Sequence, residues 1–259
     1  MSGQMFRLSH SKAQAFAECR KLYWFRYVSG EPWPAAPPNP AGCVGTGVHR
    51  AMKVLCETGD PADGAHELGV YLRMPAHECA GPGTEAHRLA FQFYEAGCAA
   101  HASIDSEKRW AEIDTWAPWP SRGMTLSARI DRADIVRGSG WQIIDWKTGA
   151  FEVDEVTDAQ LDIGHVALRT SQRMMGDAPV TAVAWNLRTG TRRVRALQKE
   201  DARATMARLA NLAQRMQAEQ GFEAMPGTFC ALCDWRQRCP EAAEVETRGW
   251  DAHAAPEET

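Results

Sequence analysis

The sequence contains no apolar run of about 18 residues, so neither a membrane-spanning helix nor a membrane partner is expected. Its first residues, MSGQMFR, lack the apolar core of a secretory signal peptide, and we therefore expect a cytoplasmic protein. No segment recurs with a period of about 20–50 residues, which excludes a repeat architecture. A Gly-x-x-x-x-Gly-Lys-Ser/Thr loop is also absent, so the sequence shows no P-loop for nucleoside triphosphates.

Lysine is scarce, since six of the 29 basic residues are lysine and 23 are arginine. The formal net charge of −4 excludes a strongly basic protein that coats nucleic acid, but not an enzyme that acts on nucleic acid. Arginine binds phosphate oxygens better than lysine does, because its planar guanidinium presents several donors. The base composition of the genome explains the excess of arginine over lysine equally well. The 44% apolar and 24% charged residues are ordinary for a globular protein and exclude wholesale disorder and a disulfide-dense miniprotein.

The hydrophobic patterning predicts helices first, then a strand meander, and then alternating helices and a hairpin. We expect helices at residues 11–28, 46–57, 85–101, 155–170 and 199–220, and strands at residues 107–116, 124–136, 141–147, 180–187 and 191–197. Residues 31–42 contain five prolines and are predicted to form a loop. This order predicts an α/β fold in which helices flank a mixed sheet. We expect one domain over residues 1–240 and a frayed acidic tail over residues 241–259.

The chemistry of the sequence begins at two aspartates on a predicted hairpin. Asp145 and Lys147 share one face of their strand, because successive strand side chains alternate between faces. The turn at residues 137–140 allows a register that places Asp131 opposite Asp145, with their Cβ atoms about 5 Å apart. Two carboxylates at this distance repel each other unless a cation lies between them. Mg²⁺ or Mn²⁺ would fit such oxygen ligands, and Lys147 could then position or activate a water.

The same residues could also belong to a surface strand with ordinary solvated charges. The Ile143-Ile144 pair argues against this alternative, because it predicts a strand that is at least half-buried. An isolated Asp-x-Lys remains a weak motif, so the spacing alone does not decide between a metal site and a solvated strand.

Asp131, followed by Asp145-Trp146-Lys147-Thr148-Gly149 after an apolar strand, resembles the PD-(D/E)XK nuclease superfamily. The resemblance is greatest to the RecB/AddB-type branch, which includes CRISPR-associated adaptation nucleases and phage homologues. That branch also has a Gly-x-x-x-His stretch on an upstream helix, matched here by residues 45–49. Its Gly-x-x-Asp motif appears as residues 128–131, with alanine in the glycine position. The resemblance spans roughly residues 9–240 and implies a restriction-endonuclease-like core.

Residue by residue, the resemblance implies that His49, Asp131 and Asp145 ligate the metal ion. The backbone carbonyl of Trp146 would be a further ligand, and Lys147 would be the catalytic lysine. Taken alone, His49 beside an apolar helix stripe would more often be a packing residue.

Three further residues are possible members of the same site. The branch carries Gln-x-x-x-Tyr on the helix after the lysine, and this chain has Gln160 but Gly164 in the tyrosine position. This departure puts the role of the tyrosine, usually contact with DNA, in doubt. His165 could replace the tyrosine, although a solvated helix histidine is the plainer interpretation. Glu107 could add a carboxylate, although acids are common at strand starts.

Cys230, Cys233 and Cys239 form a C-x2-C-x5-C cluster, which indicates a metal site in a reduced compartment. Either tetrahedral Zn²⁺ or a [4Fe–4S] cluster requires a fourth ligand, and spacing cannot identify the metal. The candidates for that ligand are Cys19, Cys43, Cys56, Cys79 and Cys98. The resembled branch includes members with one cysteine in an N-terminal helix and three near the C-terminus, which implies Cys19 and an iron–sulfur cluster. Residues 1–30 and 221–240 would together bind it, with zinc as the rival.

The resemblance implies a Mg²⁺- or Mn²⁺-dependent deoxyribonuclease, with exonuclease action on single-stranded DNA or DNA ends. Recombination, repair, phage DNA processing and CRISPR adaptation are the implied settings, and a helicase, recombinase or adaptation protein would be a separate partner. Arg20, Lys21 and Arg26, with Trp24 and Tyr27, could capture the DNA strand, although at least half of these aromatic residues are better explained as core. The alternatives are a catalytically silent DNA-binding or scaffold module on this fold, and a zinc-stabilised structural protein.

Overall fold

The computed structural model describes residues 5–34, 39–149, 155–171 and 178–243. The chain divides into two compact units. Residues 1–10 and 38–214 belong to the first unit, and residues 11–37 and 215–259 belong to the second. The expected single domain over residues 1–240 stays a prediction, and most of the expected tail lies outside the described residues.

The first unit is built on one mixed sheet. Its strands are β1 (Phe6–Ser9), β2 (Ser106–Trp119), β3 (Met124–Val136), β4 (Gly140–Lys147), β5 (Val180–Asn186) and β6 (Arg192–Leu197). The order is β1-β3-β4-β5-β6, and β2 pairs with β3. The pairs β1/β3 and β4/β5 are parallel and the others are antiparallel. This agrees with the α/β fold and mixed sheet predicted from the sequence.

Strand β3 is the place where the sheet forks. β2 pairs along the length of β3, so β1 and β4 must both use the other edge of this strand. β1 pairs with residues 124–127 of β3, and β4 pairs with residues 132–136. The intervening residues, 128–131, therefore have no strand partner in this ladder on that edge. Asp131 lies at the end of this gap, next to β4.

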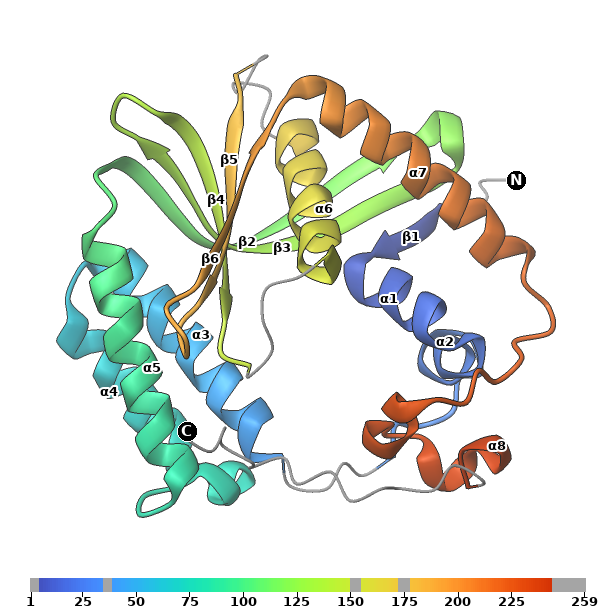
Figure 1. The fold of residues 1–259 in the computed structure, drawn as a ribbon, viewed down its shortest axis with the longest axis horizontal. Coiled ribbons are helices and arrows are strands. Elements are labelled where there is room, and N and C mark those ends of the chain that lie inside the picture. The colour runs from blue at the N-terminus through green and yellow to red at the C-terminus, as the bar shows by residue number, and fades with distance from the viewer. Residues whose placement is uncertain (1–4, 35–38, 150–154, 172–177, 244–259) are drawn as a thin grey trace, which may run out of the picture. The chain divides into compact units, whose positions relative to one another are not determined.

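Helices cover the two faces of β4 with separate apolar clusters (Figure 1). Ile144 and Trp146 pack with residues of α3 (Pro40–Thr58), α4 (Pro61–Leu72) and α5 (Glu85–Ala102). Ile143, which points to the opposite face, packs with residues of α6 (Glu155–Ser171). This two-sided burial explains the apolar run before Asp145. It also contradicts the alternative of a solvated surface strand.

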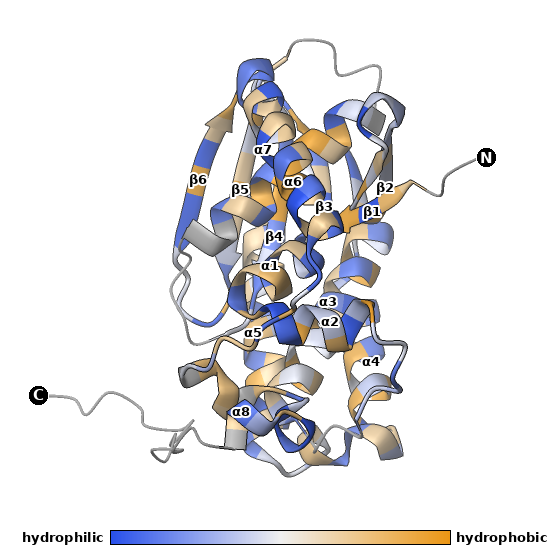
Figure 2. Cartoon of the chain, turned by 90° about the vertical axis from the view of Figure 1, so that its right-hand side faces the viewer, coloured by the Kyte–Doolittle hydropathy of each residue, from blue (hydrophilic) through white to orange (hydrophobic). Residues whose placement is uncertain are grey.

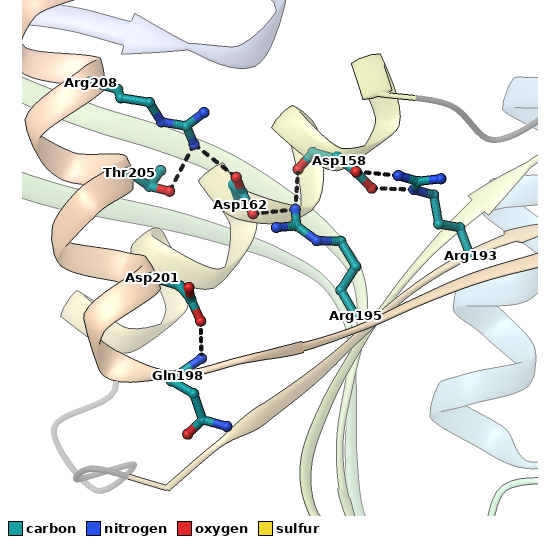
Figure 3. Close-up of polar contacts among 8 residues, drawn as sticks. All are labelled: Asp158, Asp162, Arg193, Arg195, Gln198, Asp201, Thr205 and Arg208. Carbon is teal, nitrogen blue, oxygen red and sulfur yellow. Dashed lines mark hydrogen bonds and ion pairs between the residues drawn. The ribbon is translucent and has the colours of Figure 1, made fainter.

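Ion pairs join α6 to its neighbours β6 and α7 (Lys199–Ala218), as Figure 3 shows. Asp162 of α6 lies 2.6 Å from Arg195 of β6 and 2.8 Å from Arg208 of α7. One helical turn earlier, Asp158 binds Arg193 through two hydrogen bonds. β6 has three arginines among its first four residues, and Figure 2 shows both hydrophilic and hydrophobic segments along the strand. Arg193 and Arg195 share one face of the strand and are the arginines that reach α6.

The second unit contains most of α1 (His10–Glu18), all of α2 (Arg20–Tyr27) and the C-terminal part of the described chain. The sequence predicted one helix over residues 11–28, and this prediction is wrong. Cys19 has extended backbone angles (φ −161°, ψ 122°), which end α1, while its carbonyl accepts from Tyr23 and begins α2. Phe25 stacks on Trp235 with ring centroids 4.8 Å apart, and Trp235 is fully buried.

One predicted boundary is wrong, and two elements were missed. α3 begins at Pro40 rather than near residue 46, because Asn39 caps it by accepting from the backbone N–H of Gly42. Strand β1 and helix α4 were not predicted from the sequence. Within the described residues, no helix is long and apolar enough to cross a membrane.

Candidate active site

Three elements of the first unit bring potential metal ligands together. His49 of α3, Glu112 of β2 and Asp131 of β3 each offer one ligand atom, and these atoms all lie within 4.8 Å of one another. His49 Nδ1 is 3.4 Å from Asp131 Oδ1 and 4.0 Å from Glu112 Oε1. Among the described residues, this is the only group of three or more His, Cys, Asp or Glu that meets this distance.

The fork in the sheet holds the Asp131 carboxylate in place. Arg132 pairs with Ile144, so continuing the register by one residue places Asp131 opposite Asp145, as the sequence predicted. One further step would place Ile130 opposite Trp146, but the ladder has ended there. Instead, the backbone N–H of Trp146 donates to Asp131 Oδ2 at 2.8 Å. The Trp146 side chain is buried on the other face, so only its backbone lies beside Asp131.

Asp145, Lys147 and Gln160 form a second polar chain on the α6 side of the sheet. Gln160 donates from Nε2 to Asp145 Oδ1 at 2.5 Å, and it accepts from Lys147 Nζ at 2.7 Å. Lys147 Nζ also forms an ion pair with Asp145 Oδ2, at 2.8 Å. Gln160 therefore fixes the relative positions of Asp145 and Lys147.

The charges around Asp145 favour a cation at this site. Burial, together with the negative charge of Asp131, raises the pKa of Asp145 to about 6. Burial and the same Asp131 charge also raise the pKa of Glu112. Asp145 Oδ2 is buried and is held in an ion pair with Lys147. Three carboxylates and an imidazole are a donor set that Mg²⁺ or Mn²⁺ fits.

His49 partly neutralises these carboxylates. Its burial acts to lower the imidazole pKa, but the Asp131 hydrogen bond and the charges of Asp131, Asp145 and Glu112 outweigh burial. The resulting pKa of His49 is about 9. A divalent cation would take over this role and would bind the neutral imidazole.

Backbone packing holds α3 and the end of β4 close together. A Cβ atom at Gly45 would lie 3.2 Å from Thr148 Oγ1, so glycine allows this approach. Asn186, fully buried on β5, donates to the carbonyl of Gly149, while Leu187 N–H donates to the carbonyl of Lys147. These two hydrogen bonds hold the backbone at Lys147 and Gly149 beside the end of β5.

Glu112 was missed by the sequence analysis, which considered Glu107 instead. Glu107 is 48% exposed and its nearest charged partner is Arg137, at 3.8 Å. Glu112 is placed by the β2/β3 register, which pairs Ala111 with Arg132 and Ile113 with Ile130. Its backbone has a positive φ of 49°, a strained conformation for glutamate. Only the register of β2 could have revealed it, and the irregular connection at residues 120–123 hides that register in the sequence.

The helix after Lys147 departs from the expected Gln-x-x-x-Tyr arrangement. A Cβ atom at Gly164 would lie 3.6 Å from Ile143 and 3.7 Å from Ile130, so position 164 faces the packed sheet. The expectation of a solvated His165 is wrong, because this side chain is buried and accepts from Arg169. Burial, followed by the Arg169 charge, lowers the pKa of His165 to about 4.

One pocket of the second unit is lined by all four cysteines that are predicted to bind a metal group, Cys19, Cys230, Cys233 and Cys239. We call these four residues the cysteine clip. Phe25 and Trp235 are among the other residues that line this pocket. The backbone N–H of Met225 donates to Cys19 Sγ, and that of Gly227 donates to Cys230 Sγ, each at 3.4 Å. A zinc ion with Zn–S bonds of about 2.3 Å would hold its sulfurs about 3.8 Å apart. Within the described residues, no three of these sulfurs lie within 4.8 Å of one another.

The cations of α2 already have partners within the second unit. Arg20 donates to the carbonyl of Phe16 and lies 3.5 Å from Glu219. Arg26 pairs with Asp234 at 2.9 Å. Lys21 lies over the Trp24 ring, 4.9 Å from its centroid, and Tyr27 packs on Tyr23.

Comparison with known proteins agrees with this geometry. The sequence profile of the PD-(D/E)XK nuclease superfamily matches residues 7–240, and the chain therefore belongs to this superfamily. Its members are nucleases that use divalent metal ions, and DNA is the substrate that membership implies. None of the curated proteins matches the chain.

Two solved structures are similar to the chain. A candidate exonuclease from Eubacterium rectale is 13% identical, with a TM-score of 0.52 over 84% of this chain and 83% of that chain. At this identity, the likeness shows a shared fold. The structure of SSO0001 is 12% identical and covers 75% of this chain and 85% of that chain; its TM-score of 0.39 is too low to support an argument.

Proposed function

We propose that the chain is a metal-dependent deoxyribonuclease of the RecB/AddB-type branch, acting as an exonuclease on single-stranded DNA or DNA ends. The observation that carries this proposal is the meeting of His49, Glu112 and Asp131 beside the strand that bears Asp145 and Lys147. The fold shared with a candidate exonuclease supports the exonuclease mode.

His49, Asp131 and Asp145 would hold Mg²⁺ or Mn²⁺, together with the backbone carbonyl of Trp146. We add Glu112 to this set because it lies within reach of the same ion as His49 and Asp131. When bound, the ion supplies Lewis acidity, which lowers the pKa of a water and stabilises charge on the phosphate. The carboxylates of this chain orient that centre, because each is fixed by a hydrogen bond or ion pair to its neighbours.

Lys147 is the proposed catalytic lysine. Its side chain is 32% exposed, so its amine can reach both the buried carboxylate and a substrate in solvent. It would orient or deprotonate the attacking water and would stabilise negative charge on the phosphate. Gln160 would hold the Lys147 amine in place through its 2.7 Å hydrogen bond.

We further propose that Cys19, Cys230, Cys233 and Cys239 hold a [4Fe–4S] cluster, with zinc as the rival. Each thiolate of a cubane binds a different iron, so a cubane separates its thiolates more widely than a single zinc ion does. The gathering of the four thiols in one pocket supports a bound metal group, as do the two N–H groups that donate to sulfur. Such a cluster requires reduced thiols, which supports a cytoplasmic location.

The proposed setting is recombination, repair, phage DNA processing or CRISPR adaptation. A helicase, recombinase or adaptation protein would then be a separate partner, since the sequence contains no P-loop. Arg20, Lys21 and Arg26 are weaker candidates for strand capture than the sequence suggested. Two of them already form ion pairs with Glu219 and Asp234.

A cleavage assay tests the nuclease proposal directly. End-labelled single-stranded and duplex DNA would be incubated with the purified protein and Mg²⁺ or Mn²⁺, with and without a chelator. We expect cleavage that Asp145→Ala and Asp131→Ala each abolish without unfolding the protein. Asp105→Ala is the control, because Asp105 is 72% exposed and pairs with Arg137 away from these carboxylates. Cleavage at the wild-type rate by Asp145→Ala would overturn the assignment.

One observation favours a second candidate, a catalytically silent DNA-binding or scaffold module. Gly164 replaces the expected tyrosine, and its position faces Ile130 and Ile143 rather than a substrate. This candidate predicts that wild-type protein binds DNA and leaves it intact with either ion. The same assay therefore separates the two functions.

A further inference from the structure

The elements that supply the candidate ligands also place cations beside them. Lys53 follows His49 by four residues on α3, so both side chains project from the same side of the helix. Arg129 precedes Asp131 by two residues on β3, so both point to the same face of the strand. The two cations thus flank the ligand group from two different elements.

Arg129 lies at the edge of the ligand group and is open to solvent. Its Nε is 3.6 Å from Glu112 Oε2 and 3.0 Å from Asp114 Oδ1, and the side chain is 63% exposed. Exposed ion pairs of this kind contribute about 0–1 kcal/mol, so a phosphate can displace Asp114 at little cost. A guanidinium has five donors in a planar fork, which suits phosphate oxygens.

Lys53 completes the arrangement from the helix side. Its side chain is 46% exposed, and its nearest acid is Glu57, at 3.9 Å on the same helix. Lys53 lies one helical turn from His49 on α3, and Arg129 Nε lies 3.6 Å from Glu112 Oε2. Both cations are therefore close to the ligand group while keeping exposed side chains.

We propose that Arg129 and Lys53 form a phosphate rim that binds the DNA phosphates next to the scissile bond. This inference rests on the proposed nuclease function and adds the residues that bind the substrate backbone. A DNA strand approaching Glu112, Asp131 and Asp145 brings negative charge towards negative charge. Cations on the same side of α3 and β3 as the ligands offset that repulsion where the strand would lie.

The structure offers a matched control for each rim residue. Arg137 follows directly after β3, the strand that bears Arg129; it is 66% exposed and also pairs with two acids, Asp105 and Glu107. Arg50 lies on the same helix as Lys53, is 54% exposed, and pairs with Glu67. Each control removes one positive charge of similar exposure that pairs with acids outside the ligand group.

The test is binding of a fluorescently labelled single-stranded oligonucleotide, measured by anisotropy over a range of salt concentrations with Ca²⁺ in place of Mg²⁺. Arg129→Ala and Lys53→Ala should each reduce the slope of log affinity against log salt by about 0.7. At roughly 0.1 M salt this corresponds to about fivefold weaker binding. Arg137→Ala and Arg50→Ala should match the wild type. Asp114→Asn should bind more tightly, because it removes the acid that competes for Arg129.

Thermal melting of each variant would first establish that it is folded, which we expect because all five positions are exposed. If the wild type binds and cleaves DNA but the rim variants behave like their controls, the rim proposal is wrong and the nuclease proposal stands. If the wild type neither binds nor cleaves DNA, the nuclease proposal is wrong, and the rim proposal, which rests on it, is wrong as well.

Discussion

Asp145 combines deep burial with a negatively charged neighbour, an arrangement that costs stability in the absence of a cation. Its folded-state pKa of about 6 exceeds its ordinary value of 3.8, so the charged form is disfavoured by folding. Ionisation of Asp145 therefore lowers the free energy of unfolding as pH rises from about 4 to 6, and the full cost applies above pH 6. A site that binds a metal ion would carry such a cost.

The first prediction concerns the stability that the buried charge of Asp145 costs. Asp145→Asn should raise the free energy of unfolding of chelator-treated protein at pH 8 by about 1–3 kcal/mol, because 1.36 kcal/mol corresponds to one pKa unit. The same variant should lose metal-dependent cleavage. Chemical denaturation with and without Mn²⁺ would measure the stability, and an asparagine variant that is less stable than metal-free wild type would contradict the electrostatic argument.

A second prediction concerns His49 and has its own pH window. Its folded-state pKa of about 9 lies above the ordinary 6.5, so the folded protein holds the proton more tightly than the unfolded chain. Its contribution to stability is complete below about pH 6.5 and is lost as pH rises through 9. The loss should stay below about 3 kcal/mol, because solvent screens part of the interaction at a side chain that is 30% exposed.

The measurement is chemical denaturation of the metal-free protein across this window, compared with His49→Gln. The glutamine variant cannot titrate, so its stability should fall less between about pH 6.5 and 9. Parallel stability curves for the two proteins would show that His49 does not interact with the carboxylates as the structure places it.

At the scale of the structural elements, two aspartates join α6 to its neighbours through ion pairs, and they differ in their exposure to solvent. Asp162 is 11% exposed and pairs with both Arg195 and Arg208, whereas Asp158 is 21% exposed and pairs with Arg193 (Figure 3). Removing one partner of a buried ion pair leaves the other charge without compensation. The two aspartates are one helical turn apart, which makes them a matched pair.

The third prediction follows from that difference. Asp162→Ala should lower the free energy of unfolding by about 2 kcal/mol, since it removes the more buried acid and breaks the links from α6 to both β6 and α7, although its partners Arg195 and Arg208 are 31% and 66% exposed. Asp158→Ala should cost about 1 kcal/mol, because its partner Arg193 is 40% exposed and can be solvated. Urea denaturation would measure both, and equal losses would contradict the ranking by burial.

The elements with strong local signals were predictable from the sequence, and those that depend on distant contacts were not. Strand β3 begins and ends where the apolar pattern places it, at residues 124 and 136. β1 is only four residues long and exists because Leu8 and its neighbours pair with β3 across more than a hundred residues. The break at Cys19 is equally invisible in local patterning, because it depends on backbone angles within a helical sequence.

At the scale of the whole chain, the candidate site joins residues from position 49 to position 160. The Asp145/Lys147 pair could be predicted because one strand places both on one face. The predicted hairpin register added Asp131, and the resemblance added His49 and Gln160. All three lie in polar contact with that group or with each other. Glu112 required the β2/β3 register, which is a long-range property. Local patterning therefore shows the strand that bears Asp145 and Lys147, whereas completing the ligand group requires the fold.

The cysteine clip gives a fourth prediction at this scale. Cys19 and Cys230 are 211 residues apart in the chain, yet both line the same pocket as Cys233 and Cys239. Bringing these cysteines together closes a long loop of the chain, which costs conformational entropy. The binding free energy of the metal group would offset this cost. Stability should therefore depend on each of the four cysteines.

Replacing any one of the four by serine should bleach the visible absorbance of anaerobically purified protein and lower its melting temperature by several degrees. Cys98→Ser is the control, because this thiol lies on α5 of the first unit and is expected to bind no metal. Metal analysis separates the two proposed occupants, since a brown protein with about four iron atoms indicates a [4Fe–4S] cluster and a colourless protein with one zinc indicates the rival. Wild-type absorbance in Cys19→Ser would remove Cys19 from the site. The three C-terminal cysteines would then need a different fourth ligand, and the assignment to the RecB/AddB-type branch would lose its main structural support.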